Sequence, residues 1–248
     1  MLALITLPVS AFTVRQLVIA FVVTAAFTLV ARWLRGVSNS GAAAGAVVSF
    51  LIYLGAGPAG FVALVTVFVV TWASTRWRYR QKQHLGIAEK RGGRRASQVL
   101  ANIGIAALCA LMHAFHPGQA LYLLAMAAAL SEAAADTVSS EIGQASSGNA
   151  RLITTWKQVP AGSDGGISPV GTLAGIAAAT VVSLVCAFTH LLPWTWFAIS
   201  VFAPVTGMVA DSVMGATLER HGFLNNDLVN FLSTCIAAAT AFAFIKPL

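Results

Sequence analysis

The chain carries very little charge for its length. Only 9% of its 248 residues are Asp, Glu, Lys or Arg, whereas soluble domains carry roughly 25%. Hydrophobic residues make up 58% of the chain, and the mean hydropathy is +0.80. This composition excludes a water-soluble enzyme and a disordered chain. It predicts an all-α, polytopic helical bundle that forms a single transmembrane domain over residues 1–248.

Cysteine is scarce as well, which excludes a disulfide scaffold. The three cysteines, Cys109, Cys186 and Cys235, lie in apolar runs, and the sequence contains no CxxC pair. They are interpreted as small buried hydrophobic residues. The formal charge of +7 would suggest a nucleic-acid partner in a soluble protein. In a membrane protein the first question about the positive charge is which side of the bilayer holds the Lys and Arg residues. No nucleic-acid partner is expected.

Uncharged apolar runs predict about eight transmembrane helices, and seven to nine are compatible with the ~20 residues that one span needs. The second and third runs are short and separated only by residues 55–60, so they form either a tight helical hairpin, which we favour, or a re-entrant pair. Residues 1–10 have neither a basic region nor a cleavage site, so no cleaved signal peptide is predicted. The predicted spans are 14–30, 41–54, 61–74, 99–115, 119–135, 171–192, 194–217 and 228–244.

The basic residues favour one orientation in the membrane. An eight-span arrangement with both termini outside places 13 of the 15 Lys and Arg residues on the cytoplasmic side, as the positive-inside rule requires. We therefore predict a cytoplasmic basic loop at 76–95 and a cytoplasmic Gly-rich loop at 142–168, in the plasma (inner) membrane. The inside set is Arg32, Arg35, Arg76, Arg78, Arg80, Lys82, Lys90, Arg91, Arg94, Arg95, Arg151, Lys157 and Arg220.

Most acidic residues are predicted on the same side. Glu132, Asp136 and Glu141 are placed at the cytoplasmic end of the fifth span, and Asp211 near that end of the seventh. A carboxylate in an apolar helix costs about 2.5–3.5 kcal/mol on insertion scales, so such residues usually mark ion, proton or substrate sites. Because Glu132 and Asp136 are four residues apart, they share one face of the helix.

Two further features converge on these acids. A glycine-rich segment, 161–168, precedes a helix whose N-terminal amides would attract an anion, although an ordinary connecting turn is the alternative. On the fourth span Arg94, Gln98 and Asn102 share a face, for which a cytoplasmic anchor with interhelical hydrogen bonds is the alternative. Carboxylates hold Mg²⁺, the metal bridges phosphate oxygens, and Arg neutralises the remaining charge. The combination predicts a phosphoryl-transfer site at the membrane surface.

The sequence also contains a weak internal repeat. Residues 135–138 (ADTV) resemble 210–213 (ADSV), and residues 40–45 resemble 170–175. Small residues let helices pack closely, which alone accounts for the second pair. The first pair predicts that Asp136 and Asp211 form two sides of one metal or phosphate site.

Five motifs that occur in order make the chain similar to a known family. Together they resemble the integral-membrane family known as domain of unknown function ninety-two, which includes the transmembrane-protein-nineteen group and the plant phytyl-phosphate kinases. The resemblance covers residues 38–230, most of the chain. The motifs are RASQVLAN at 95–102, DTVSSEIG at 136–143, GSDGGIS at 162–168, ADSVMGAT at 210–217 and NNDLVN at 225–230.

The resemblance implies Mg²⁺-dependent transfer of a phosphate from a nucleoside triphosphate, expected to be CTP, to an isoprenyl (phytyl-like) monophosphate, giving the diphosphate. On this hypothesis Asp136, Glu141 and Asp211 are the catalytic residues and the Mg²⁺ ligands. Positioning and charge neutralisation supply most of the rate, because the acceptor is already ionised. The expected substrate- and nucleotide-binding residues are Arg94, Arg95, Gln98, Asn102, Ser140, Lys157, Gly162, Ser163, Asp164, Gly165, Gly166, Ser168, Thr172, Asn226 and Asn230.

Two other functional classes stay open. Carboxylates in the membrane, small-residue repeats and internal symmetry are also typical of secondary transporters, so the main alternative is a transporter or lipid carrier for an anionic substrate or a cation. A structural or regulatory role is the third class. Transporter sites lie near the bilayer midplane, whereas these acids are predicted at one face. The expected partners are the lipid bilayer, an isoprenyl monophosphate and a nucleoside triphosphate, and a homodimer is compatible with the sequence.

Overall fold

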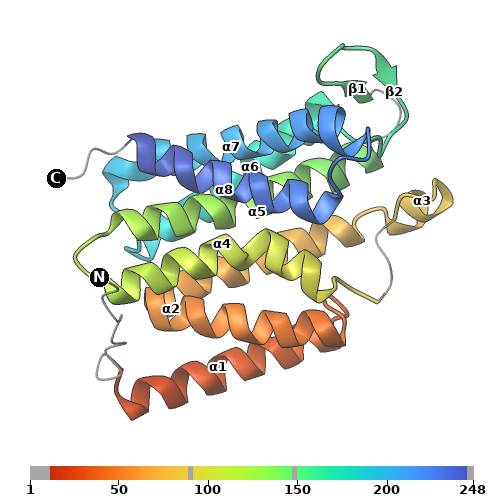
Figure 1. Cartoon of the computed structure of the whole chain (residues 1–248). Helices are drawn as coiled ribbons and strands as arrows, with labels where there is room; N and C mark the ends of the chain where they lie inside the picture. Colours follow the sequence, from red (N-terminus) through yellow and green to blue (C-terminus); the bar gives the residue numbers. More distant parts are fainter. Residues whose placement is uncertain (1–11, 89–91, 147–149, 245–248) are drawn as a thin grey trace.

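Figure 1 shows the computed structural model of the chain, in which residues 12–88, 92–146 and 150–244 are described. In this part of the chain, seven helices are long and apolar enough to cross a membrane. The protein is therefore an integral, multi-pass membrane protein, as predicted. The helices are α1 (Val14–Trp33), α2 (Asn39–Arg76), α4 (Ala96–Phe115), α5 (Leu121–Ala145), α6 (Pro169–Phe188), α7 (Phe197–Met214), which η2 (Trp194–Trp196) and η3 (Gly215–Glu219) extend, and α8 (Asn226–Phe244).

Helix α2 is a hairpin. Gly57 has φ 66° and ψ −165°, a conformation that essentially only glycine adopts, and Pro58 follows it without an amide hydrogen to donate. The rings of Tyr53 and Phe61 lie 5.7 Å apart, whereas eight residues of continuous helix would separate them by ~12 Å. The two halves of α2 therefore pack against each other in opposite directions. Counted separately, they bring the seven helices to the predicted eight passes.

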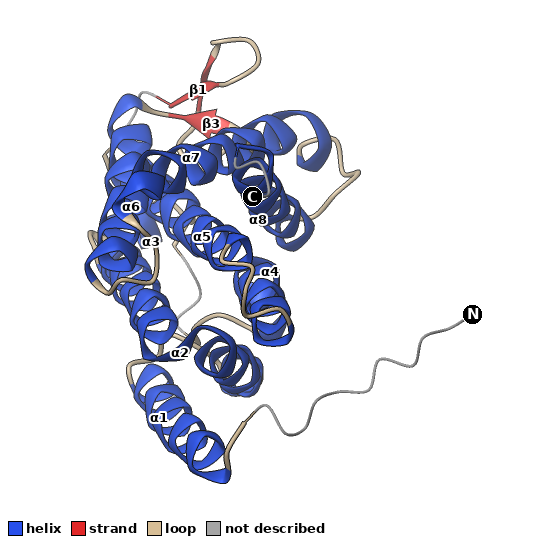
Figure 2. Cartoon of the chain, turned by 90° about the vertical axis from the view of Figure 1, so that its left-hand side faces the viewer, coloured by secondary structure: helices blue, strands red, loops and turns tan. Residues whose placement is uncertain are grey.

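Helix α5 lies at the centre of the bundle. It packs against α2, α4, α6, α7 and α8, and residues 124–130 are fully buried. Figure 2 shows α1 at one edge of the bundle, next to α2, with α5 farther inside. Small residues allow the close approach: a Cβ at Gly175 would lie 2.8 Å from the Ala135 carbonyl oxygen, and one at Gly207 would lie 2.6 Å from Glu132 Cγ. The fold thus uses small residues for helix packing, as the repeat suggested.

Helix α5 extends beyond the apolar run that predicted it. The run ends at 135, and the helix continues to Ala145 through Asp136 and Glu141, which the prediction placed at the end of this span. A polar stretch ended the apolar run in the sequence. Protein encloses α5 on several sides, so its polar residues find partners in the bundle and the helix continues.

Both loops at one end of the bundle contain short elements that were not predicted. They are two to six residues long, too short for a periodic pattern to reveal. In the Gly-rich loop, three strands form an antiparallel sheet in the order β2-β1-β3, with Arg151 opposite Gln158 and Ile167. The elements are α3 (Tyr79–His84), β1 (Ala150–Leu152), β2 (Gln158–Val159) and β3 (Gly166–Ile167).

The basic loop 76–95 and the Gly-rich loop 142–168 lie at the same end of the bundle (Figure 1). Arg78 Nη1 donates to the Ala145 carbonyl oxygen at 3.1 Å, and Gly162 approaches Ile87. The start of α1 and the end of α8 lie at the opposite end. Residues 1–10, Lys90, Arg91 and Lys246, which entered the topology prediction, lie outside the described residues.

Single-cysteine labelling tests whether this end faces the cytoplasm. Cysteines introduced at the exposed positions His84 and Thr154 should react with a membrane-impermeant maleimide only in inside-out vesicles, because the positive-inside rule places both loops inside. A cysteine at Gly118, in the exposed α4–α5 connection at the other end, should react only in right-side-out vesicles. Cys109 and Cys186 are buried, so Cys235 is the native cysteine that must be replaced to prevent background labelling. Labelling of His84→Cys and Thr154→Cys from opposite sides would contradict the topology.

Candidate functional site

A polar cavity of about 480 Å³ lies at the loop end of the bundle, between α4, α5, α7, α8 and the Gly-rich loop. Sixteen of the eighteen predicted site residues line it. They are Arg94, Arg95, Gln98, Asn102, Asp136, Ser140, Glu141, Gly162, Ser163, Asp164, Gly165, Gly166, Ser168, Asp211, Asn226 and Asn230.

The other two predicted residues do not line the polar cavity. Lys157 is exposed in the turn between β1 and β2, and Thr172 lies in the first turn of α6. The nearby Gly171 is a packing residue, since a Cβ there would lie 2.6 Å from the Ser139 carbonyl oxygen. Neither Lys157 nor Thr172 therefore joins the site in this structure.

The two aspartates of the repeat come together. Asp136 on α5 lies close enough to Asp211 on α7 to interact with it electrostatically, and it also faces Arg94. Asp211 Oδ2 is buried and has no hydrogen-bond partner among the described residues. Because a buried, unpartnered carboxylate oxygen is costly, this pair is suited to hold a cation.

Glu132 lies deeper than the prediction placed it. It is eleven residues from the start of the 25-residue helix α5, so it lies mid-helix and not at the cytoplasmic end. Its side chain is 1% exposed, and Oε1 has no hydrogen-bond partner among the described residues. It interacts electrostatically with Asp136 and Asp211. A third carboxylate therefore lies beneath the aspartate pair, although it does not line the cavity.

Glu141 pairs with a lysine and not with the two aspartates. Its carboxylate forms an ion pair with Lys82 of α3, a side chain that is fully buried. Lys82 Nζ also donates to the carbonyl oxygens of Ser74 (3.2 Å) and Thr75 (2.9 Å).

Glu141 lies five residues after Asp136 on α5, and five residues of helix rotate its side chain about 140° away from that of Asp136. Among the described residues, no group of three His, Cys, Asp or Glu side chains is placed to hold a metal, so Glu141 does not complete the expected ligand set.

Arg94 is fixed by its backbone and its side chain. Its amide donates to the Gly36 carbonyl oxygen at 3.1 Å, and its carbonyl accepts from the Ser38 amide at 3.0 Å. Its Nη2 donates to Thr137 Oγ1 on α5 at 3.0 Å. The α1–α2 turn and α5 thus hold this guanidinium beside Asp136 before any ligand binds.

Gln98 and Asn102 line the cavity next to Arg94, and both are engaged within α4. Gln98 Oε1 accepts from the Arg95 amide at 2.9 Å at the start of the helix. Asn102 Nδ2 donates to the Gln98 carbonyl oxygen at 2.8 Å. These polar side chains are therefore positioned by their own helix.

The glycine loop has a structural reason for its sequence. Gly165 has φ +70°, and a Cβ there would lie 2.4 Å from the Ala216 amide nitrogen of η3. The loop docks on the end of α7 at this point, so packing accounts for Gly165, and the approach of the loop to a phosphate stays a prediction. Ser168 Oγ accepts from the Gly171 amide at 3.1 Å and so caps α6. The π-helical turn η3 adjoins the loop, and such turns are frequent at functional sites.

Sequence reasoning missed several residues. Lys82 was assigned to the basic loop, and no local pattern signals its burial against Glu141. The hydroxyl residues at 137, 139 and 212 lie inside the quoted motifs, so their proximity to the predicted residues was an available signal. The additional polar residues that line the cavity are Thr137, Ser139, Gln144, Ser212 and Glu219.

The fold and the site define a multi-pass helical membrane protein with a polar cavity, lined by acidic and basic residues, at one end. The family described as integral membrane protein DUF92 matches residues 22–238, and the chain belongs to this family.

Three relatives illustrate the family. Protein VTE6, chloroplastic, of Arabidopsis thaliana is 34% identical over 214 residues, which are 83% of this chain and 64% of that protein. The chain thus spans less than two thirds of that relative. The uncharacterized membrane protein sll0875 of Synechocystis is 36% identical over 79% of this chain and 77% of its own. The uncharacterized membrane protein MJ0933 of Methanocaldococcus jannaschii is 31% identical over 90% and 92%. No solved structure matches.

Breaking the buried ion pair should destabilise the protein. Lys82→Met leaves the Glu141 carboxylate without its counter-charge, and loss of one partner of a buried pair costs about 3–5 kcal/mol. Lys82→Met combined with Glu141→Leu should recover most of that stability, because neither charge is then buried alone. Thermal unfolding in micelles measures both effects. Lys157→Met, at an exposed lysine, is the control and should change little. If the double variant loses as much stability as Lys82→Met and Glu141→Leu lose together when measured separately, the pairing is contradicted.

Proposed function

We propose that the protein transfers a phosphate from a nucleoside triphosphate, with CTP as the expected donor, to an isoprenyl, phytyl-like monophosphate. The supporting observation is that one polar cavity brings together the Asp136–Asp211 pair, Arg94 and the Gly-rich loop. Membership of the family and the resemblance to phytyl-phosphate kinases supply the reaction class. The product is the isoprenyl diphosphate.

The donor set fits Mg²⁺. The ligands are carboxylate oxygens, one of them buried without a partner, and Mg²⁺ is usually bound by one or two carboxylates together with substrate phosphates. Asp136 and Asp211 would hold the ion. When bound, it would neutralise charge on the triphosphate oxygens.

The chain's own residues do the positioning. An oxygen of the acceptor monophosphate forms the new bond to the γ-phosphorus, and the bond from that phosphorus to the β-phosphate oxygen breaks, which releases the nucleoside diphosphate. The acceptor oxygen is already ionised, so no general base is required. Arg94 and Arg95 line the cavity where two anions would meet, and preorganised cations there reduce their repulsion.

The distribution of basic residues supports a membrane location and an orientation for the protein. We place the protein in the plasma (inner) membrane with the polar cavity facing the cytoplasm, where nucleotides are available. The isoprenyl tail would stay in the apolar part of the bundle while its phosphate reaches the cavity.

A carrier for an anion or a cation is the second candidate, and Glu132 favours it. This buried carboxylate lies mid-helix, and transporters bind coupling ions near the midplane. The residues that line the polar cavity, however, lie at the loop end of the bundle. A carrier has no need of a nucleotide, which separates the two candidates experimentally.

Removal of either charge from the aspartate pair should abolish turnover. Asp136→Asn and Asp211→Asn should each lower the rate on the order of 10²-fold or more, because one preorganised electrostatic group commonly contributes that much. The assay combines purified protein, Mg²⁺, labelled CTP and phytyl monophosphate. Asp227→Asn, in the first turn of α8, where this side chain does not line the cavity, is the matched control and should keep its activity. Near-wild-type activity of either cavity variant would remove that residue from the site.

Nucleotide binding can be tested without turnover. CTP at 100 times its Kd should stabilise the folded protein by roughly 2.7 kcal/mol, and differential scanning fluorimetry would detect the shift. ATP, GTP and UTP serve as comparisons for the base. The absence of a shift with any of the four, with Mg²⁺ and phytyl monophosphate present, would favour the carrier.

A further inference from the structure

A second cavity, the apolar cavity, lies on the other side of α4. It has a volume of about 690 Å³, within the range of roughly 300–1,000 Å³ typical of small-molecule sites. Residues of α1, both halves of α2 and the first half of α4 line it. Its apolar wall includes Phe27, Val48, Leu64, Val67, Phe68 and Ile103.

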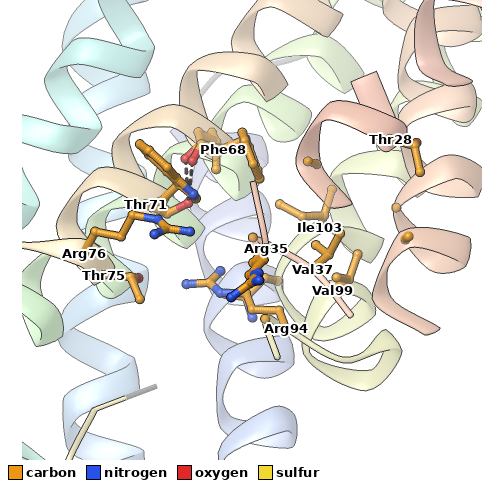
Figure 3. A pocket seen from close by; sticks show the side chains of 18 of the residues that line it. Thr28, Arg35, Val37, Phe68, Thr71, Thr75, Arg76, Arg94, Val99 and Ile103 are labelled. Atoms are coloured by element: carbon orange, nitrogen blue, oxygen red, sulfur yellow. Dashed lines mark hydrogen bonds between the residues drawn. The ribbon is translucent and has the colours of Figure 1, made fainter. Parts of the chain in front are cut away.

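The mouth of the apolar cavity is strongly positive. In Figure 3 the side chains of Arg35, Arg76 and Arg94 point toward the same region, beyond Phe68 and Thr71. Arg78 and Arg80 also line this end, and no described residue that lines the cavity is acidic. Arg94 faces Asp136 of the polar cavity, whereas the other four arginines have no counter-charge among the lining residues, so this mouth is suited to an anion.

The arginines differ in whether their guanidinium groups already have partners in the protein. Arg76 stacks on Trp72 at 4.5 Å and donates to the Leu34 carbonyl oxygen, and Arg94 donates to Thr137. Among the described residues, Arg35 has no hydrogen-bond or ion-pair partner for its guanidinium. Its backbone is left-handed, with φ 56°, a conformation that is uncommon for a residue other than glycine. Arg35 is thus held at the mouth with its donors available.

The apolar cavity and the polar cavity share a wall. Gly93, Arg94 and Asn102 line both of them. The aspartate pair lies on one side of this wall, and the arginine mouth lies on the other. A phosphate bound at the mouth would therefore lie next to the site where the nucleotide phosphates are expected.

We propose that the apolar cavity is the acceptor site: it holds the single isoprenyl chain between α1, α2 and α4, with the terminal monophosphate at the arginine mouth. This inference rests on the proposed function and adds to it a place for the lipid. Complementarity supports the assignment, because an apolar lining suits the chain and an arginine-rich mouth suits a phosphate monoester. Arg94 would contact both anions and so set the distance between acceptor and donor.

Two glycines provide a matched test of the chain site. Gly45 lines the apolar cavity, and an added Cβ would meet nothing within 4 Å, so Gly45→Leu projects a side chain into the cavity without a backbone clash. Gly104 on α4 has the same free space but lines neither cavity. Gly45→Leu should weaken binding of labelled phytyl monophosphate at least tenfold, in lipid nanodiscs without nucleotide. Gly104→Leu should bind like the wild type.

A second pair of variants tests the phosphate site. Arg35→Gln should weaken binding of phytyl monophosphate at least fivefold and leave binding of phytol unchanged, while Arg35→Lys should recover part of the loss. Arg32 lies three residues earlier, donates to Asn39 and lines neither cavity, so Arg32→Gln is the control. Inorganic phosphate and phosphatidic acid are the competitors, and neither should displace the prenyl phosphate at equal concentration.

The outcomes separate this inference from the proposed function. Unchanged binding in Gly45→Leu, or an equal loss in Gly104→Leu, would overturn the acceptor site even if the enzyme is active. Preferential binding of phosphatidic acid would overturn it as well, since the cavity would then hold a membrane phospholipid. Wild-type binding that Gly45→Leu and Arg35→Gln weaken, in a protein that transfers no phosphate, would keep the acceptor site and overturn the kinase proposal.

Discussion

The burial of α5 constrains the rest of the bundle, because this helix carries three carboxylates into a region that other helices enclose. Acidic residues at such depth need partners inside the protein. Glu141 has Lys82, and Asp136 has Arg94 nearby. Glu132 interacts with Asp136, Asp211 and Ser233, and none of these groups is a cation. Glu141 and Asp136 are therefore matched by cations, while Glu132 and Asp211 each retain one carboxylate oxygen without a hydrogen-bond partner among the described residues.

The basic loop supplies these partners, which gives the positive residues a second role. Lys82 leaves the loop and becomes fully buried, Arg78 reaches the end of α5, and Arg94 is tied to both the α1–α2 turn and α5. Residues on which the predicted orientation in the membrane rests thus also lie beside the acids of the central helix. Arg76 and Arg80 of the same loop line the apolar cavity. The positive charge at this end of the protein is thus divided between residues that pair with α5 and residues that line the apolar cavity.

Hydropathy predicted the spans well because each apolar run is a local property of the chain. The polar cavity could also be predicted, since its motifs fall at matching ends of successive helices and antiparallel helices bring those ends together. Lys82 could not be assigned, because its burial depends on contact with a residue fifty-nine positions away. The apolar run alone did not indicate how far α5 extends, for a similar reason: its polar last turns lie in a helix that other helices enclose.

The apolar cavity had no signal in the sequence at all. Phe27, Val48 and Leu64 lie in three different apolar segments and are of the same kind as residues that face lipid. What distinguishes them is the cavity between α1, α2 and α4, at a place where α1 packs chiefly on α2. A cavity between loosely packed helices is a property of the assembled bundle, so residue types in a single segment cannot indicate it.

The arrangement of the two cavities bears on the choice between enzyme and carrier. A carrier needs one site that two sides of the membrane reach in turn. Here two sites of opposite chemical character meet at a wall formed by Arg94 and Asn102, and both have lining residues at the loop end. Between them and the other end lie the fully buried residues 124–130 of α5. Two adjoining sites approached from one side are suited to transfer of a group between two bound ligands, and this argument holds even though Glu132 lies mid-helix.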